Sequence, residues 1–200
     1  NQGFGCGGTG HPFLVWLYTD ATKRAEKKGC DHISNWDVSK ITDMLSGAFS
    51  TETYDGDGFI DDLSCWDTSR VTTMEKTFDK NPWYNQPMGC WDTAKVTSMT
   101  RTFAGTNFNQ DISAWDTAKV KYMDGTFDNA TKFDQDISAW DVSNVTDMSS
   151  FLENAKAFNQ SLGSWSFPSI PSGDEADSCT FAAGSGCPLP RCGANMAGCT

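Results

Sequence analysis

Tryptophan recurs at nearly constant intervals along this 200-residue chain, and this periodicity limits the possible folds more than any other feature. Spacings of 24 to 30 residues separate Trp36, Trp66, Trp91, Trp115, Trp140 and Trp165. Aspartate follows the first five of them, and Ser166 breaks the series. Internal repeats of this length are typical of stacked architectures, in which each unit buries its apolar face against its neighbours.

Other apolar residues recur at fixed positions relative to each Trp, and each such set of equivalent positions is called a column. The third position before each Trp holds Ile, Leu or Met, the fifth position after it holds Ile or Val, and Met occupies the eighth position in five units. After Trp115, the residues Val120, Met123 and Phe127 follow at steps of three and four, which predicts one face of a short helix. The preceding stretch, 108–115, alternates loosely between apolar and polar residues and predicts a short strand.

One strand and one helix per unit predict an α/β solenoid, a right-handed leucine-rich-repeat-like stack of about five to six coils over residues 30–167. Only 38% of the chain is apolar, yet it has 8 Trp and 13 Phe, so the core should be narrow and aromatic. Residues 1–29 are expected to form an N-terminal capping segment with a helix. Residues 168–200, rich in Cys, Gly and Pro, are expected to form a tail held by disulfides.

Charge and cysteine content bear on location and partners. A net charge of -11 repels phosphate backbones and argues against nucleic acid, whereas cations, basic proteins and neutral glycans remain open. Eight cysteines without a CxxC pair, and only His11 and His32, favour disulfides in an oxidising compartment over structural zinc. The longest apolar run, 13–18, is too short to span a bilayer. Beginning at Asn1 without an apolar leader, the chain is interpreted as a processed secreted protein or a fragment.

Two stretches carry a resemblance to a known family. FNQDISAWD (108–116) and DISAWDVSNVTDMSSF (136–151) closely resemble the BspA-like surface repeats, a leucine-rich-repeat-like family first noted in bacterial and mycoplasma surface proteins. The resemblance covers about residues 30–166, and the segment 29–44 is similar to related repeat proteins of unicellular algae and other protists. It implies an extracellular or cell-surface location and interaction roles such as adhesion, without catalytic residues.

The even number of cysteines predicts a set of disulfides. Cys65 and Cys90 each precede a Trp in successive repeats, where equivalent positions of stacked coils lie about 4.8 Å apart, so we expect them to pair. The alternative is that both are free thiols. Pairing of Cys6 with Cys30 would fix the cap to the first coil. Three connectivities remain open for the tail cysteines Cys179, Cys187, Cys192 and Cys199.

The aspartates have two interpretations. The column after Trp is either a cation ladder or a series of helix caps, and we favour caps because stacked carboxylates repel one another. The insertion 53–64, TYDGDGFIDDLS, half resembles an EF-hand loop. It is interpreted as a solvated insertion, with a weak calcium site at Asp55 and Asp57, assisted by Asp61 or Asp62, as the alternative. No other cofactor is expected.

Two further surface features follow from the repeat. Asn129, Asn144 and Asn159 begin glycosylation sequons. The sixth position after Trp holds Thr in the units of Trp36, Trp66, Trp91 and Trp140, while Lys121 interrupts the series. A flat, exposed Thr ladder would indicate ice binding, but the position falls inside the predicted helix.

No catalytic constellation emerges from the sequence, so we expect a non-enzymatic extracellular or cell-surface module that binds other extracellular proteins or glycans through the solenoid face. The alternative is a structural subunit of an extracellular layer or filament, in which copies of the chain contact one another. A calcium- or ice-binding protein is the third hypothesis.

Overall fold

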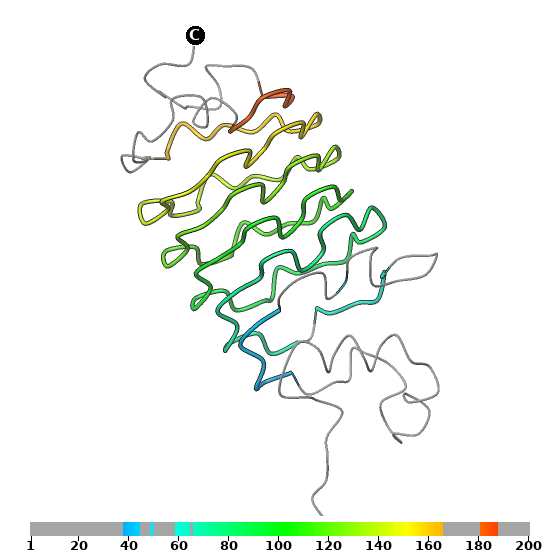
Figure 1. Cartoon of the computed structure of the whole chain (residues 1–200), viewed down its shortest axis with the longest axis vertical. Helices are drawn as coiled ribbons and strands as arrows, with labels where there is room; N and C mark the ends of the chain where they lie inside the picture. Colours follow the sequence, from blue (N-terminus) through cyan, green and yellow to red (C-terminus); the bar gives the residue numbers. More distant parts are fainter. Residues whose placement is uncertain (1–37, 45–48, 50–58, 65, 166–180, 188–200) are drawn as a thin grey trace, which may run out of the picture.

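The computed structural model describes residues 38–44, 49, 59–64, 66–165 and 181–187. They form a stack of coils, which we name after their tryptophans (the Trp91 coil, the Trp115 coil). Figure 1 shows the coils lying one above another in chain order along the long axis. Isolated parallel β-bridges join equivalent positions of successive coils, pairing Asp43 with Thr73, Thr73 with Ser98, Ser98 with Tyr122, and Tyr122 with Asp147.

The predicted α/β solenoid is wrong, because the part of the chain that the structure describes contains no helix and its bridges never extend into a strand. The predicted helix over 120–127 is a succession of turns. The N–H groups of Met123 and Gly125 donate to Asp147 and Ser149 of the next coil, each at 2.8 Å, and not to carbonyls four residues back. Gly125 also has φ +55°, which a right-handed helix does not accept.

The predicted strand at 108–115 is also absent. Within it, the Trp115 N–H donates to the Ile112 carbonyl at 3.1 Å, closing a turn. Each coil is therefore a chain of turns that brings every third or fourth residue inward, and this produces the same apolar spacing as a helix.

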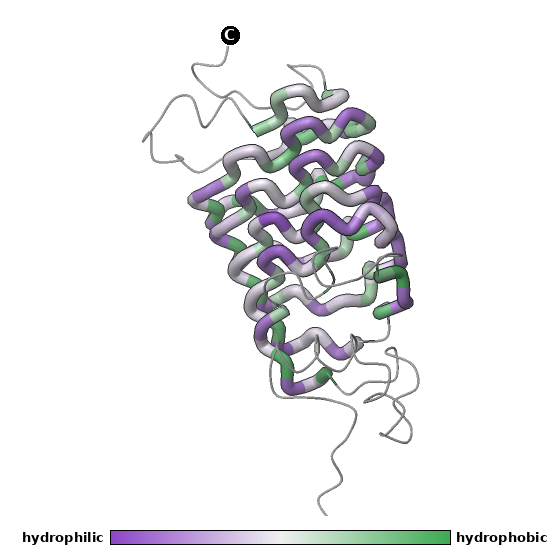
Figure 2. Tube along the Cα trace, turned by 45° about the vertical axis from the view of Figure 1, so that its right-hand side comes forward, coloured by the Kyte–Doolittle hydropathy of each residue, from purple (hydrophilic) through white to green (hydrophobic). Residues whose placement is uncertain are grey.

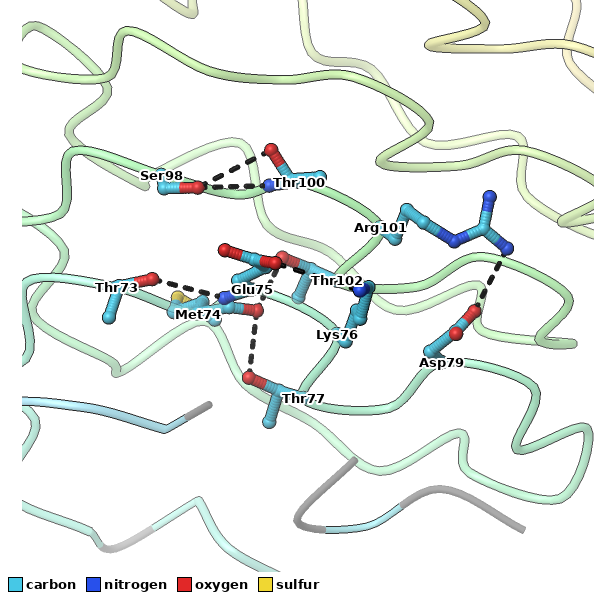
Figure 3. A network of polar contacts seen from close by, with 10 residues as sticks. All are labelled: Thr73, Met74, Glu75, Lys76, Thr77, Asp79, Ser98, Thr100, Arg101 and Thr102. Atoms are coloured by element: carbon cyan, nitrogen blue, oxygen red, sulfur yellow. Dashed lines mark hydrogen bonds and ion pairs between the residues drawn. The ribbon is translucent and has the colours of Figure 1, made fainter. Parts of the chain in front are cut away.

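One side of each coil is joined to the next coil by the main chain. We call this the main-chain side; it comprises positions 6 to 14 after each Trp. Alternate N–H groups of the Trp91 coil, those of Met99, Arg101, Phe103 and Gly105, donate to the Trp115 coil over 2.7 to 2.9 Å. Buried threonine hydroxyls add to these bonds. Figure 3 shows the hydroxyls of Thr77 and Thr102, from successive coils, both directed at the Met74 carbonyl, at 2.8 and 2.9 Å.

The other side is joined by side chains. This side-chain side comprises positions from 6 before to 4 after each Trp. The indole Nε1 of Trp115 donates to the Met88 carbonyl of the preceding coil at 3.0 Å. The Thr117 hydroxyl donates to the Asp141 carbonyl of the next coil, also at 3.0 Å. These bonds recur from coil to coil, so the residue columns of the sequence hold the stack together on this side.

The core is a continuous series of stacked rings. Phe103 stacks on Phe78 and Phe127, each at 5.6 Å between ring centroids. Trp115 lies between Trp91 and Trp140, at 6.5 and 6.2 Å. Figure 2 shows polar and apolar residues alternating along each coil, as expected where one set faces the core and the other faces solvent. The predicted burial of Trp66, Trp91, Trp115 and Trp140 is confirmed, since each is at most 4% exposed.

Residues 181–187 continue the main-chain side of the stack beyond the Trp140 coil. The N–H groups of Leu152 and Asn154 donate to the carbonyls of Phe181 and Ala183, both at 2.7 Å, which repeats the main-chain side. The Phe181 ring stacks on Phe151 at 5.5 Å, and Figure 1 shows this segment in orange-red against the last yellow coil. The predicted N-terminal helix and the rest of the tail lie outside the described residues. Among the residues described, none forms a helix with the length and apolar character needed to cross a membrane.

Candidate binding surface

The aspartate column is satisfied within its own coils. Asp67, Asp92, Asp116 and Asp141 each accept the N–H group two residues later, at 2.9 to 3.0 Å. The predicted local contact is thus present, but it closes a turn and does not cap a helix. Hydrogen bonds from Ser143, through its side chain and its N–H, lower the pKa of Asp141. Within the described ranges, no three His, Cys, Asp or Glu side chains gather to hold a metal ion.

The calcium site proposed for the insertion falls only partly on described residues. Asp55 and Asp57 lie outside them. Asp62 accepts the Ser64 N–H at 2.8 Å, so one of its oxygens serves a local turn, and Asp61 is half-buried. Calcium binding here stays a prediction.

The cysteine pattern differs from the predicted one at Cys90, which is a free, exposed thiol. The expected Cys65–Cys90 disulfide is therefore not formed in the structure; Cys65 itself lies outside the described residues. The column before Trp faces solvent, since Ala114 and Ala139 are also exposed there. Cys187 is disulfide-bonded to a partner outside the described ranges. The remaining predicted disulfide residues also lie outside them: Cys6, Cys30, Cys179, Cys192 and Cys199.

All three glycosylation candidates are exposed. The amide of Asn144 donates to the Ala118 carbonyl at 2.8 Å, and that of Asn129 donates to the Asp128 carboxylate at 2.5 Å. The Asn159 side chain makes no hydrogen bond with the described part of the chain. Glycan attachment stays a prediction.

The threonine column lies exposed on the main-chain side and not within a helix. The hydroxyls of Thr72, Thr97 and Thr146 each donate to a carbonyl of the preceding coil, at 2.9 to 3.1 Å. Because these donors are already used between coils, the column offers a ladder of acceptor oxygens and few free hydroxyl protons.

A charged network crosses three coils on the main-chain side. The Arg101 guanidinium lies 3.1 Å from Asp79 of the preceding coil and 3.3 Å from Asp128 of the next (Figure 3 shows the Asp79 contact). Burial acts to lower the Arg101 pKa, but the two carboxylates raise it above its usual value. Burial raises the pKa of Asp128 in spite of the guanidinium. All three charges are paired, so this network is structural.

Three large apolar side chains protrude from the described surface: Ile60 is 52% exposed, and Trp83 and Tyr122 are each 49% exposed. Ile60 lies on the side-chain side of its coil, and Trp83 lies two residues before that side begins in the next coil. The Gln86 side chain donates to the Ile60 carbonyl at 2.7 Å, and Gln86 is three residues from Trp83. Sequence reasoning missed Trp83, although the signal was present, because this Trp lies outside the repeated column.

Amide residues lie near Trp83 in its own coil and in the adjoining one. Asn107 donates to the Pro82 carbonyl at 2.8 Å, which places it beside Trp83. Asn85, two residues after Trp83, accepts the Asn109 N–H at 2.8 Å, and Gln110 follows Asn109 in the adjoining coil. We call this set the Trp83 patch: Ile60, Trp83, Asn85, Asn107 and Gln110.

Comparison with known proteins gives a family. Two overlapping stretches, residues 18–107 and 84–176, match the family described as Mycoplasma protein of unknown function, DUF285. The chain belongs to this DUF285 family. The matches together cover most of the chain and include every tryptophan coil described above. No curated protein and no solved structure matches this DUF285 chain.

Proposed function

We propose that this DUF285 chain is a non-enzymatic interaction module that acts outside the cell or at its surface. The BspA-like character of its repeats is part of the proposal and would place the chain among surface proteins. Its ligands would be extracellular proteins or glycans, and it would need no cofactor for binding.

One observation carries the proposal. The described surface is polar and carboxylates such as Asp92 and Asp79 are used in turns and ion pairs, yet it presents the half-exposed side chains of Ile60, Trp83 and Tyr122. Burying large apolar side chains is favourable, so leaving them at the surface has a cost that binding can offset. Side chains held on stacked coils are also fixed in position, which favours recognition without rearrangement.

Surface labelling and cell binding test the proposal. A membrane-impermeant biotin reagent should label the native protein on intact cells of its source, or the protein should be recovered from the medium. Fluorescently labelled purified chain should bind the surface of the same cells in a saturable manner. A protein found only inside the cell, or labelled chain that does not bind, would contradict it.

The structural-subunit alternative gives a different result in the same preparation. Sedimentation velocity over a hundredfold concentration range would then show growing oligomers without any added ligand. A chain that stays monomeric while it binds cells supports recognition over assembly.

A further inference from the structure

We infer that the Trp83 patch binds a neutral carbohydrate chain. This inference rests on the proposed interaction function and names its surface and ligand class. The half-exposed indole of Trp83 offers a flat apolar face of the kind that packs on the C–H face of a pyranose ring. The amides around it supply the donors and acceptors that sugar hydroxyls require.

An unused amide strengthens the assignment. The glutamine column on this side normally joins coils: Gln86 donates to Ile60, Gln135 to Asn109 and Gln160 to Asp134. Gln110 is the exception, since it makes no hydrogen bond with any residue that the structure describes. Gln110 directly follows Asn109, whose N–H donates to Asn85, and within the described part of the chain no residue uses its amide.

Charge selects among possible carbohydrates. None of the five side chains in the patch is ionised, and the chain as a whole carries a net charge of -11. That charge disfavours sulfated or uronic-acid polymers and leaves neutral sugars as the favoured class.

The apolar area argues against a protein partner at this patch. Only Ile60 and Trp83 are apolar there, whereas a stable protein interface buries roughly 800 Å² on each partner around an apolar centre. One stacked ring bordered by amides suits a sugar unit better than a second protein surface.

The same coils provide a matched control. Tyr122 is as exposed as Trp83, at 49%. It lies at a β-bridge position on the main-chain side, outside the Trp83 patch. If any exposed aromatic ring bound polysaccharide non-specifically, Trp83→Ala and Tyr122→Ala would lose the same amount of binding. Only binding at the patch separates Trp83→Ala from Tyr122→Ala.

Affinity electrophoresis of the full chain through gels containing neutral polysaccharides (β-glucan, mannan, xylan or galactan) tests the inference, with dextran sulfate as the charged comparison. We expect retardation by at least one neutral polymer, weakened about tenfold in Trp83→Ala and several-fold in Gln110→Ala, and unchanged in Tyr122→Ala. Urea midpoints equal to wild type will show that the variants are folded, as expected for exposed positions.

Three outcomes overturn the inference: no neutral polymer retards the chain, only dextran sulfate retards it, or Trp83→Ala binds as tightly as wild type. Repeating the cell-binding assay with Trp83→Ala separates the two proposals. Undiminished cell binding would reject the carbohydrate patch but leave the interaction function standing, whereas absence of cell binding by wild type would reject the interaction function.

Discussion

The two sides of each coil hold the stack together by different means. On the main-chain side, N–H groups such as those of Met99 and Phe103 reach carbonyls of the next coil directly. On the side-chain side, the contacts between coils pass through the Trp115 indole, the Thr117 hydroxyl and the Asn109 amide.

The difference explains where the sequence repeats strictly and where it varies. Every residue except proline carries a main-chain donor and acceptor, so the main-chain hydrogen bonds of this side do not require particular side chains. Its bridge column accordingly holds Asp43, Thr73, Ser98, Tyr122 and Asp147. The side-chain side needs an indole, a hydroxyl or an amide at fixed positions, and there the same residue types recur. Much of the repeat signature therefore encodes the side-chain side and the core, while the main-chain side repeats its threonines at positions 6 and 11 after Trp.

Replacing Trp115 with Ala should give the largest effect. It removes a ring stacked between Trp91 and Trp140 and leaves a cavity, so the free energy of unfolding should fall by about 3–5 kcal/mol. Trp115→Phe should cost about 1–3 kcal/mol, since it loses one hydrogen bond and some packing while the Met88 carbonyl keeps the Trp91 N–H. Urea denaturation measures both values.

A control from the main-chain side makes the comparison quantitative. Tyr122→Thr places threonine at a β-bridge position, as Thr73 already does in an earlier coil. It should change the free energy of unfolding by less than about 0.5 kcal/mol. A cost equal to that of Trp115→Phe would show that the two sides do not differ as described.

Removing the Asn109 amide, which joins two coils, should reduce stability by an intermediate amount. The Asn109 Oδ1 accepts the Asp134 N–H at 2.9 Å and the Gln135 amide at 2.8 Å, and Asn109→Ala leaves both donors without this acceptor. The expected loss is about 1–2 kcal/mol in the same denaturation assay.

The chain itself supplies the control for this variant. One coil later, Asp134 accepts the Asn159 N–H at 2.8 Å and the Gln160 amide at 2.9 Å through a carboxylate oxygen. Asn109→Asp should therefore retain most of the stability. Equal losses in Asn109→Asp and Asn109→Ala would mean that the acceptor oxygen is not what joins these coils.

The sequence predicted the core of this fold better than its backbone. The columns identified the buried tryptophans and the local aspartate contacts correctly, because both depend on which residue stands at which repeat position. The helix was wrong because turns and helices share apolar steps of three and four. Positions with positive φ would have revealed the turns if glycine recurred at them. The tenth position after Trp, however, holds Lys76, Arg101 and Ser150 as well as Gly125, so the sequence shows no recurring glycine there.

The candidate surface was harder to predict for a related reason. Repeat analysis identifies residues that recur in every coil, and on the side-chain side those residues hold successive coils together. Trp83 is informative because it departs from the columns. Gln110 is informative because the other glutamines of its column are hydrogen-bonded, while Gln110 bonds to none of the described residues. Neither departure has a meaning until the coil geometry shows which side chains face solvent.

Tyr84→Phe should stabilise the protein slightly. The Tyr84 hydroxyl is buried and has no hydrogen-bond partner within the described part of the chain, and burial, together with the charge of Asp62, raises its pKa far above the usual range. Phe108, Phe133 and Phe158 fill the same position in later coils. Removing the hydroxyl should raise the free energy of unfolding by about 1 kcal/mol, measured by urea denaturation. A loss of stability would mean that the hydroxyl has a partner, such as an ordered water.

The smallest expected effect is a pH dependence of opposite sign on the two sides. On the side-chain side, hydrogen bonds from Ser113, Ser138 and Ser143 lower the pKa values of Asp111, Asp136 and Asp141. The unfolded chain then binds protons first as the pH falls below about 4, so the stability that these carboxylates contribute at neutral pH is lost on acidification. On the main-chain side, burial raises the pKa of Asp128, and its contribution is instead lost as the pH rises through that raised value.

Asparagine variants separate the two contributions. Asp136→Asn keeps an acceptor oxygen for the Ser138 N–H but no longer titrates, so its stability should fall less than that of wild type between about pH 6 and pH 3. Asp128→Asn removes the opposing group, so its acid loss should be steeper than that of wild type, although the weakened pairing with Arg101 lowers its stability at every pH. The measurement is the slope of unfolding free energy against pH for the three proteins. If both variants shift this slope in the same direction, the carboxylates of the two sides do not differ in the way that their hydrogen bonds and burial indicate.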